Sequence, residues 1–396
     1  MRHKFTIAVF ISLLIVFFTL VVIFPKDENS SKNENRKLAD FPDFNTSSLV
    51  SGKFMKEFET YLSDNVGFRS VFTKVSANYE SLKGFNSFGK LVNTTGDLGT
   101  GNTTSNQLLV LDDKVMEVYR ADKKVRENYI SMINDYANFL PDNINFYNIL
   151  FPTQIDFLDF YNTIGDSEKE SIDYFYNSYS ERVKNINVYD TLKDNYDKGE
   201  YVYFRTDHHW TTLGAYYTYE EMAKHLDMPR LNIDDFIEDK QNNFLGHLYT
   251  QAKNPSLAKN PDTIFYYKNF TNDIPIHPIS YTYKPGERIE YNGKMFCPEL
   301  GADYKLFLAG DHPFIEINSD SPNDRTLLII KDSYSNALIP WLTCGYNQVL
   351  VIDARTFDRK ISDILTEYEV DDFIIANYIF GTNFQDYVDL CNNIKE

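Results

Sequence analysis

Cysteine is scarce in this 396-residue sequence, which contains only Cys297, Cys344 and Cys391. So small and odd a number excludes the disulfide framework that holds many small secreted domains together. One disulfide is compatible with the count, but we expect three buried, inert thiols. Apolar residues make up 43% of the chain and aromatic residues 16%, so a packed core can stabilise the fold instead.

Positive charge is also in deficit, because 39 lysines and arginines face 57 acidic residues for a formal charge of -18. A chain this acidic repels phosphate backbones, so nucleic-acid binding is excluded as a function. Histidine is rare, with seven residues, and neither HExxH nor CxxC occurs. A zinc site built from Asp207, His208 and His209 with His247, His277 or His312 is the alternative we weigh least. We expect no metal and no cofactor.

One long apolar run stands near the start of the chain. Residues 5–24 contain no charged side chain, and 20 helical residues span roughly 30 Å, the thickness of a bilayer core. Arg2 and Lys4 precede the run and favour a cytoplasmic N-terminus. No small-residue cleavage site and no cysteine follows. Residues 1–25 are therefore predicted to be an uncleaved signal anchor of a single-pass membrane protein, with the rest of the chain extracytoplasmic.

The composition changes twice before a regular pattern begins. Residues 26–40 are polar and charged, which predicts a flexible stalk. Residues 41–105 are predicted to form a helical N-terminal region, because apolar residues recur at helical spacing, followed by a loop rich in Asn, Thr and Gly.

From residue 106 to residue 396, apolar strands alternate with amphipathic helices. The expected strands are 107–111, 145–151, 201–204, 326–330, 348–352 and 372–376, and the expected helices are 122–140, 171–183, 213–226, 334–342, 362–368 and 384–394. Continuous apolar strands separated by helices predict an α/β domain with a mostly parallel sheet covered on both faces. Residues 229–323, rich in Pro, Asn, Tyr and Asp, interrupt the pattern and are predicted to be an irregular insertion.

Two segments far apart in the chain carry the residues of a serine triad. Asp207 and His209 lie two positions apart, and Ser333 directly follows the expected strand 326–330. In an extended segment, residues i and i+2 face the same side, so Asp207 and His209 can converge while His208 points away. Sites in parallel sheets lie at the carboxyl ends of strands, where Asp207, Ser333 and Asn377 are all expected. A serine hydroxyl needs a base to become nucleophilic, and a histidine oriented by a carboxylate supplies it.

The stretch Thr206–Thr211 (TDHHWT), followed by residues 213–217 (LGAYY), resembles the signature of the DHHW family of exported bacterial proteins. That family resembles the alginate O-acetylation proteins, which contain a permuted SGNH-hydrolase-like domain. Weaker matches lie at residues 34–42, 64–69 and 333–336. The resemblance extends over most of the chain after the apolar run, and it also selects Asp207 and His209 rather than His208.

The expected roles follow from the residues and from this resemblance. Ser333 is the predicted nucleophile, His209 the base and Asp207 the residue that orients the imidazole. The backbone N–H of Ser333 and the side chain of Asn377 are candidate oxyanion donors, although Asn377 also fits a turn residue. Arg205 is expected either to contact substrate or to pair with a carboxylate. Lys331-Asp332-Ser333 lacks the glycine of the Gly-Asp-Ser block common in SGNH hydrolases.

The resemblance implies an extracytoplasmic O-acetyltransferase that modifies a cell-surface or secreted polysaccharide. It also implies a multipass membrane acyltransferase as the partner that delivers the acyl group. Two alternatives stay open at the level of the sequence. One is a carbohydrate esterase that removes acetyl groups, and the other is a polysaccharide-binding or assembly protein that retains the fold without catalysis.

Overall fold

The structure is a computed structural model, and it describes part of the chain. The described residues are 10–12, 40–64, 89–97, 103–252, 254–270, 276–277, 280–284, 287–291, 294–319 and 321–396. The predicted anchor and stalk therefore lie almost entirely outside the described residues. Among the residues that are described, no helix has both the length and the apolar character needed to cross a membrane.

A seven-stranded sheet forms the centre of the molecule, with the order β5-β4-β14-β12-β13-β11-β8. Its strands are β4 (Asn145–Phe151), β5 (Val183–Asn185), β8 (Ile276–His277), β11 (Phe314–Ser319), β12 (Thr326–Lys331), β13 (Gln348–Ile352) and β14 (Asp372–Tyr378). Neighbours from β5 to β13 pair in parallel, whereas β11 is antiparallel to both β13 and β8. The strands β4, β12 and β14 are almost wholly buried, as a sheet covered on both faces requires. The predicted mostly parallel α/β sheet is confirmed.

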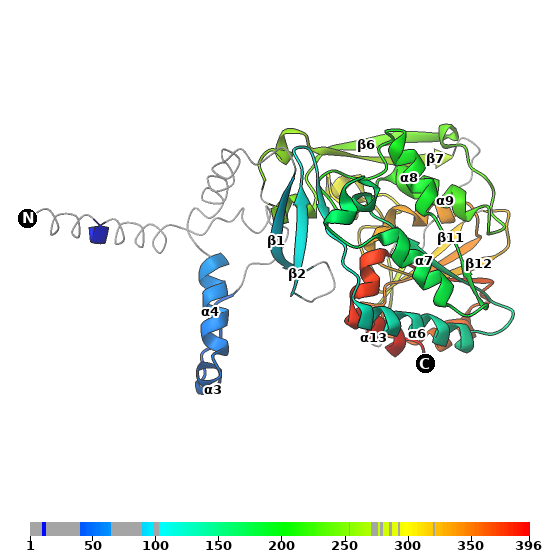
Figure 1. The fold of residues 1–396 in the computed structure, drawn as a ribbon. Coiled ribbons are helices and arrows are strands. Elements are labelled where there is room, and N and C mark those ends of the chain that lie inside the picture. The colour runs from blue at the N-terminus through cyan, green and yellow to red at the C-terminus, as the bar shows by residue number, and fades with distance from the viewer. Residues whose placement is uncertain are drawn as a thin grey trace, which may run out of the picture.

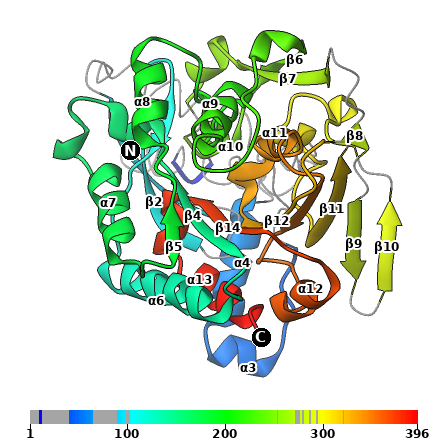
Figure 2. The same cartoon turned by 90° about the vertical axis from the view of Figure 1, so that its right-hand side faces the viewer.

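Helices cover this sheet on two sides. Figure 2 shows α6, α12 and α13 along one side, and α8, α9 and α11 along the other. Polar caps fix where helices begin: Asp122 accepts hydrogen bonds from the first turn of α6, Ser167 from that of α7 and Thr211 from that of α9. The helices are α6 (Lys123–Phe139), α7 (Glu168–Ser178), α8 (Tyr189–Asp197), α9 (Thr212–Met222), α11 (Ile339–Leu342), α12 (Ile361–Glu367) and α13 (Gln385–Asn393).

A second, antiparallel sheet precedes the α/β domain in the sequence. It contains β1 (Lys90–Asp97), β2 (Thr103–Val110) and β3 (Val115–Glu117), and the hairpin of β1 and β2 is labelled in Figure 1. Residues 107–110 form a strand, as predicted, but they pair with β1 and β3, so they do not belong to the parallel alternation in which they were expected. Before this sheet, α3 (Thr46–Val50) and α4 (Lys53–Asp64) are helices within the predicted N-terminal helical region. The loop expected at the end of that region was wrong where it is described, because residues 90–97 form β1 and residues 103–105 begin β2.

The predicted insertion is only partly an insertion. It contributes the hairpin β6 (Phe236–Phe244) and β7 (Asp262–Phe270), the helix α10 (His247–Ala252), and the hairpin β9 (Ser280–Lys284) and β10 (Glu287–Tyr291). However, β8 and β11 also fall within residues 229–323 and belong to the central sheet. β11 is mostly buried, but half of its residues (FIEINS) are polar, so it lacks the continuous apolar run that marks the inner strands.

Short 3₁₀ turns complete the described elements at Gln154–Phe157, Tyr161–Thr163, Ile233–Asp235, Leu257–Lys259, Pro298–Leu300, Tyr304–Leu306, Ser333–Ala337 and Ile379–Asn383. The helix expected over residues 334–342 is thus one 3₁₀ turn followed by the short helix α11. Cys297, Cys344 and Cys391 are buried free thiols, as the sequence predicted.

Candidate active site

Ser333 lies at the end of β12, one of the inner strands of the central sheet. Asp332 caps the turn that Ser333 begins, since its carboxylate accepts hydrogen bonds from the backbone N–H of Tyr334 and that of Tyr378, both at 3.0 Å. Asp332 thereby ties the nucleophile turn to β14, and burial raises the pKa of its carboxyl to about 6. Lys331 occupies the position that is glycine in the Gly-Asp-Ser block of SGNH hydrolases. Its buried ammonium binds Asp311 at 2.9 Å and Asn336 at 2.6 Å, so the longer side chain is accommodated below the turn.

The three predicted triad residues come together although Asp207 and Ser333 are far apart in the chain. The Nε2 atom of His209 lies 3.0 Å from Oγ of Ser333, and its Nδ1 atom lies 2.5 Å from Oδ1 of Asp207. Both separations are hydrogen-bonding distances, and their order is that of a nucleophile, its base and the group that orients the base.

Asp207 is buried and remains an anion because its surroundings donate to it. Burial alone would raise the pKa of this carboxyl, but the imidazoles of His209 and His208 and the N–H donors hold the pKa well below its ordinary value. The backbone N–H of His209 donates to Oδ1 at 3.0 Å, and the backbone N–H of His247 donates to Oδ2 at 2.7 Å. A carboxylate with both oxygens engaged can hold the imidazole in one tautomer.

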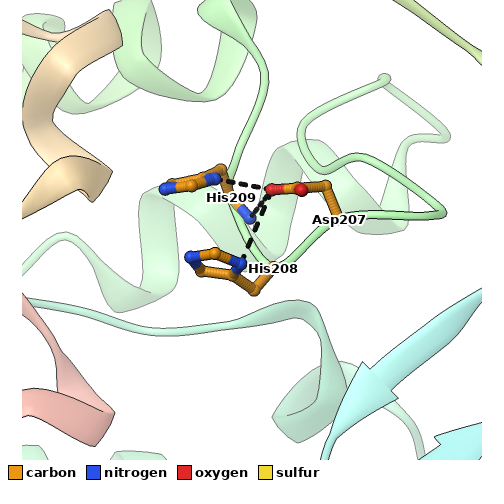
Figure 3. A group of neighbouring side chains, drawn as sticks. All are labelled: Asp207, His208 and His209. Carbon is orange, nitrogen blue, oxygen red and sulfur yellow. Dashed lines mark hydrogen bonds and ion pairs between the residues drawn. The ribbon is translucent and has the colours of Figure 1, made fainter. Parts of the chain in front are cut away.

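His208 does not point away, contrary to the sequence prediction. Residues 205–209 form a bend rather than an extended strand, because the Asp207 side chain accepts the N–H two residues on. Both histidines consequently face the same carboxylate, as Figure 3 shows. The Nδ1 atom of His208 is 3.6 Å from Oδ1 of Asp207, and its ring centroid is 3.8 Å from that of His209. Burial, and then the neighbouring His209, hold the pKa of His208 well below its ordinary value.

Two of the three residues that could bind a metal ion, Asp207 and His209, are already engaged in the triad. Ligand atoms of Asp207, His208 and His209 lie within 4.8 Å of one another, and this is the candidate group among the described residues. Both ring nitrogens of His209, however, face Asp207 and Ser333. The Nε2 atom of His247 contacts Gln251 and that of His312 contacts a backbone carbonyl oxygen.

Arg205 and Asn377 make other contacts. The guanidinium of Arg205 binds Oδ1 of the buried Asp262 at 3.1 Å, so the carboxylate-pair alternative describes its position. Asn377 lies within β14 and not beyond its end, because pairing with β4 continues to Tyr378. Its amide accepts from Tyr129 at 2.8 Å and donates to the carbonyl oxygen of Tyr378 at 3.0 Å. An oxyanion role for Asn377 stays a prediction that these contacts do not support.

Sequence reasoning missed the supports that come from residues 229–323. Tyr304 stacks on His209 with ring centroids 3.8 Å apart and planes 7° from parallel. Asp262 accepts from the backbone N–H and the hydroxyl of Thr206, directly before the triad carboxylate. Gly246 packs so closely on Asp207 that an added Cβ would lie 2.3 Å from its side chain. A glycine after apolar residues was the only local sign of such a close approach.

A small cavity lies behind Asp207. Its lining includes Met116, Glu117, Gln154, His208 and Leu248. Glu117 is only 4% exposed, and no described residue forms a hydrogen bond with either of its carboxylate oxygens. Burial, and secondarily the charge of Asp207, raise the pKa of Glu117 to about 8, so the carboxyl is mainly neutral at pH 7.

Ser333 is partly buried, whereas His209 and Asp207 are buried, and together they form a Ser-His-Asp arrangement next to the end of an inner strand of a mostly parallel α/β sheet. This geometry is that of a serine-hydrolase-like site. Residues 86–352 match the family described as "DHHW protein", and the chain belongs to that family. No curated protein shows a significant match to the sequence.

Solved structures share the fold. A DHHW family protein from Eubacterium siraeum is 24% identical, with 77% of this chain and 99% of that chain covered and a TM-score of 0.64. PatB1 of Bacillus cereus, solved with a sulfonyl adduct, is 20% identical, with 74% and 99% covered and a TM-score of 0.60. The O-acetyltransferase domain of Pseudomonas putida AlgJ also matches, with 71% and 97% covered, but its 12% identity and TM-score of 0.42 are too low to show a shared fold.

Proposed function

We propose that this chain is an O-acetyltransferase that modifies a polysaccharide through an acyl-enzyme on Ser333. The proposal rests mainly on the chain of hydrogen-bonding contacts that joins Oγ of Ser333 to Nε2 of His209, and Nδ1 of His209 to the carboxylate of Asp207. That arrangement turns an alcohol into a nucleophile for an acyl carbon, which is the first requirement of acyl transfer.

The reaction divides into two balanced halves. In the first, Oγ of Ser333 bonds to the acyl carbon while its proton moves to Nε2 of His209, and Asp207 stabilises the resulting imidazolium. The tetrahedral intermediate then expels the donor's leaving group, which takes the proton from Nε2 and leaves an ester on Ser333. In the second half, a sugar hydroxyl gives its proton to Nε2 and bonds to the acyl carbon. Ser333 leaves as the alcohol once it regains that proton.

Transfer to a sugar must compete with hydrolysis. Bulk water is present at about 55 M, whereas a well-oriented acceptor reaches an effective molarity of roughly 10⁵ M or more, which is sufficient to win. Residues 229–323 are our candidate for the surface that orients the acceptor. Their contacts with two triad residues, through Tyr304 on His209 and His247 on Asp207, support this assignment.

We further propose that the catalytic domain is extracytoplasmic and attached to the cell membrane by residues 1–25. The apolar run at residues 5–24 supports this location. An enzyme outside the cytoplasm needs an acyl group delivered across the membrane, so the proposed donor is a multipass membrane acyltransferase.

Covalent labelling tests the nucleophile. PatB1 has been solved with a sulfonyl adduct, and sulfonyl fluorides react with activated serines because the serine oxygen displaces fluoride. We expect phenylmethanesulfonyl fluoride to modify Ser333, as identified by peptide mass spectrometry, and His209→Ala to abolish labelling while circular dichroism is unchanged. Equal labelling of the wild type and the His209 variant would remove the triad from the proposal.

Product analysis tests the acceptor. The protein is incubated with a chromogenic acetyl ester, with and without oligosaccharides. We expect acetylated oligosaccharide to form, and Ser333→Ala to reduce its formation on the order of 10⁴-fold or more, since triad members act as a unit. If ester is consumed at one rate with every glycan tried, and free acetate is the sole product, the protein is an esterase.

A further inference from the structure

The face of the His209 ring is covered by an aromatic side chain that the triad mechanism does not use. The ring of Tyr304 lies 3.8 Å from the imidazole, centroid to centroid, and the two planes differ by 7°. Asp207 and Ser333 contact the imidazole at its edge, through the two nitrogens. Tyr304 contacts the π face, so its effect on the ring is distinct from theirs.

Tyr304 is itself held rigidly. Its side chain is buried, and its ring packs against Phe307 at 5.2 Å and against Phe204 at 6.3 Å. Its hydroxyl donates to the carbonyl oxygen of Tyr334 at 2.9 Å. Tyr334 directly follows the nucleophile, so Tyr304 connects the base to the turn that presents Ser333.

We propose that Tyr304 is a positioning residue that fixes the imidazole by its face and stabilises the imidazolium that forms when Ser333 loses its proton. The inference rests on the proposed acyl-transfer function. It adds that residues 229–323 help to form the active site, in addition to any role in binding a glycan.

The physical basis is the negative face of an aromatic ring. A cation over that face is attracted more strongly than a neutral group, and the attraction increases when water is excluded, as it is around buried Tyr304. His209 is neutral before the proton transfer and positive after it. The stack is therefore stronger in the transition state than in the ground state, which is the condition for an effect on kcat rather than on KM.

Other titratable groups also face His209, and the test must separate them from Tyr304. They are Asp207, His208 and Tyr334, with ring-centroid distances of 3.8 Å for His208 and 5.6 Å for Tyr334. Beyond these, Glu117 interacts with Asp207, and Arg355 with His208. A substitution at position 304 that preserves ring volume leaves all of these groups in place.

The first experiment uses the full chain in detergent and a chromogenic acetyl ester. Tyr304→Leu removes the π face, Tyr304→Phe retains it without the hydroxyl, and Tyr174→Leu is the control for the same change of residue outside residues 229–323. Tyr174 is exposed on α7, where its ring contacts Arg126. We expect Tyr304→Leu to lower kcat about 10- to 30-fold with little change in KM, and Tyr304→Phe and Tyr174→Leu to stay within about threefold of wild type. The acid limb of the pH–rate profile should shift about one pH unit toward lower pH in Tyr304→Leu only.

A fluorination series protects the test against misfolding. Phenylalanine and its mono-, tri- and pentafluoro derivatives are introduced at position 304, since fluorine weakens the negative face with little change in shape. We expect kcat to fall stepwise along the series, and the midpoint of the His209 titration, followed by NMR of the labelled imidazole, to move to lower pH. A flat series in both measurements overturns the inference. If the wild type shows neither turnover nor sulfonyl labelling, the proposed function fails, while the NMR series still tests the stack.

Discussion

Replacing Glu117 by glutamine tests whether the cavity behind the triad keeps a carboxyl group neutral. Glu117 is 4% exposed, and burial raises the pKa of its carboxyl from 4.5 to about 8. Between those two pH values the folded protein retains a proton that the unfolded chain has lost. The stability of the wild type therefore falls as the pH rises above 4.5, and it stops falling above about pH 8.

The size of the stability loss follows from the difference between the two pKa values. Each pH unit between them lowers the free energy of unfolding by about 1.4 kcal/mol, so the wild type has lost roughly 3 kcal/mol of stability at pH 7 and about 5 kcal/mol above pH 8. Glutamine has a similar shape and does not titrate. Glu117→Gln should therefore match the wild type in acid and exceed its stability by those amounts at neutral and alkaline pH.

Denaturant unfolding of both proteins across a pH series measures this difference, with the exposed Glu181→Gln as the control for loss of one acidic residue. We expect the stability gap to open with rising pH for Glu117→Gln and to stay small for Glu181→Gln. A gap for Glu117→Gln that is constant with pH would refute the reasoning, because it would mean that Glu117 ionises similarly in both states.

Two further substitutions test the surroundings of the triad. Gly246→Ala should lower ester turnover at least tenfold and reduce the melting temperature, because the new methyl group would lie 2.3 Å from the Asp207 side chain. Such overpacking costs about 1–3 kcal/mol of stability. If the variant has the turnover and melting temperature of the wild type, the loop that contains Gly246 can move and the prediction is wrong. His208→Ala should reduce turnover far less than His209→Ala in steady-state kinetics, because His209 is the histidine that lies within hydrogen-bonding distance of Ser333. If His208→Ala is the worse variant, the assignment of the base is wrong.

The sequence predicted the central sheet well because its inner strands are buried on both faces. Strands such as β12 and β14 are continuous apolar runs with polar residues beyond them, and this signal is local. Ser333 was predictable for the same reason, because it follows the end of β12. The strand expected at residues 201–204 was wrong, because these residues form only an isolated antiparallel bridge between Tyr203 and Trp210. Asp207 and His209 therefore reach Ser333 from a loop and not from the end of a parallel strand.

The supports of the triad were not predictable, because they arise from tertiary contacts without a local pattern. Tyr304 is one of 29 tyrosines, and nothing near it in the sequence marks it as a neighbour of His209. The position of His208 was wrong because the Asp207 side chain captures a nearby N–H and bends the backbone. Asn377 was expected beyond its strand, but the pairing of β14 with β4 extends further than the apolar run.

The position of β14 in the sheet also determines how this chain must acquire its fold. β14 is the only strand that pairs with both β4 and β12 among the described residues, and the contact between Asn145 and Asp372 joins positions 227 residues apart. β4, Asp207 and His209 are synthesised well before β14. At that stage the strand that joins β4 to β12 does not yet exist. Until it arrives, the strand edges of β4 and β12 stay unpaired, which is the state most prone to aggregation. Because long-range parallel pairing is slow, we expect the pairing of β14 to be a slow step of folding, during which the unfinished chain needs protection from aggregation.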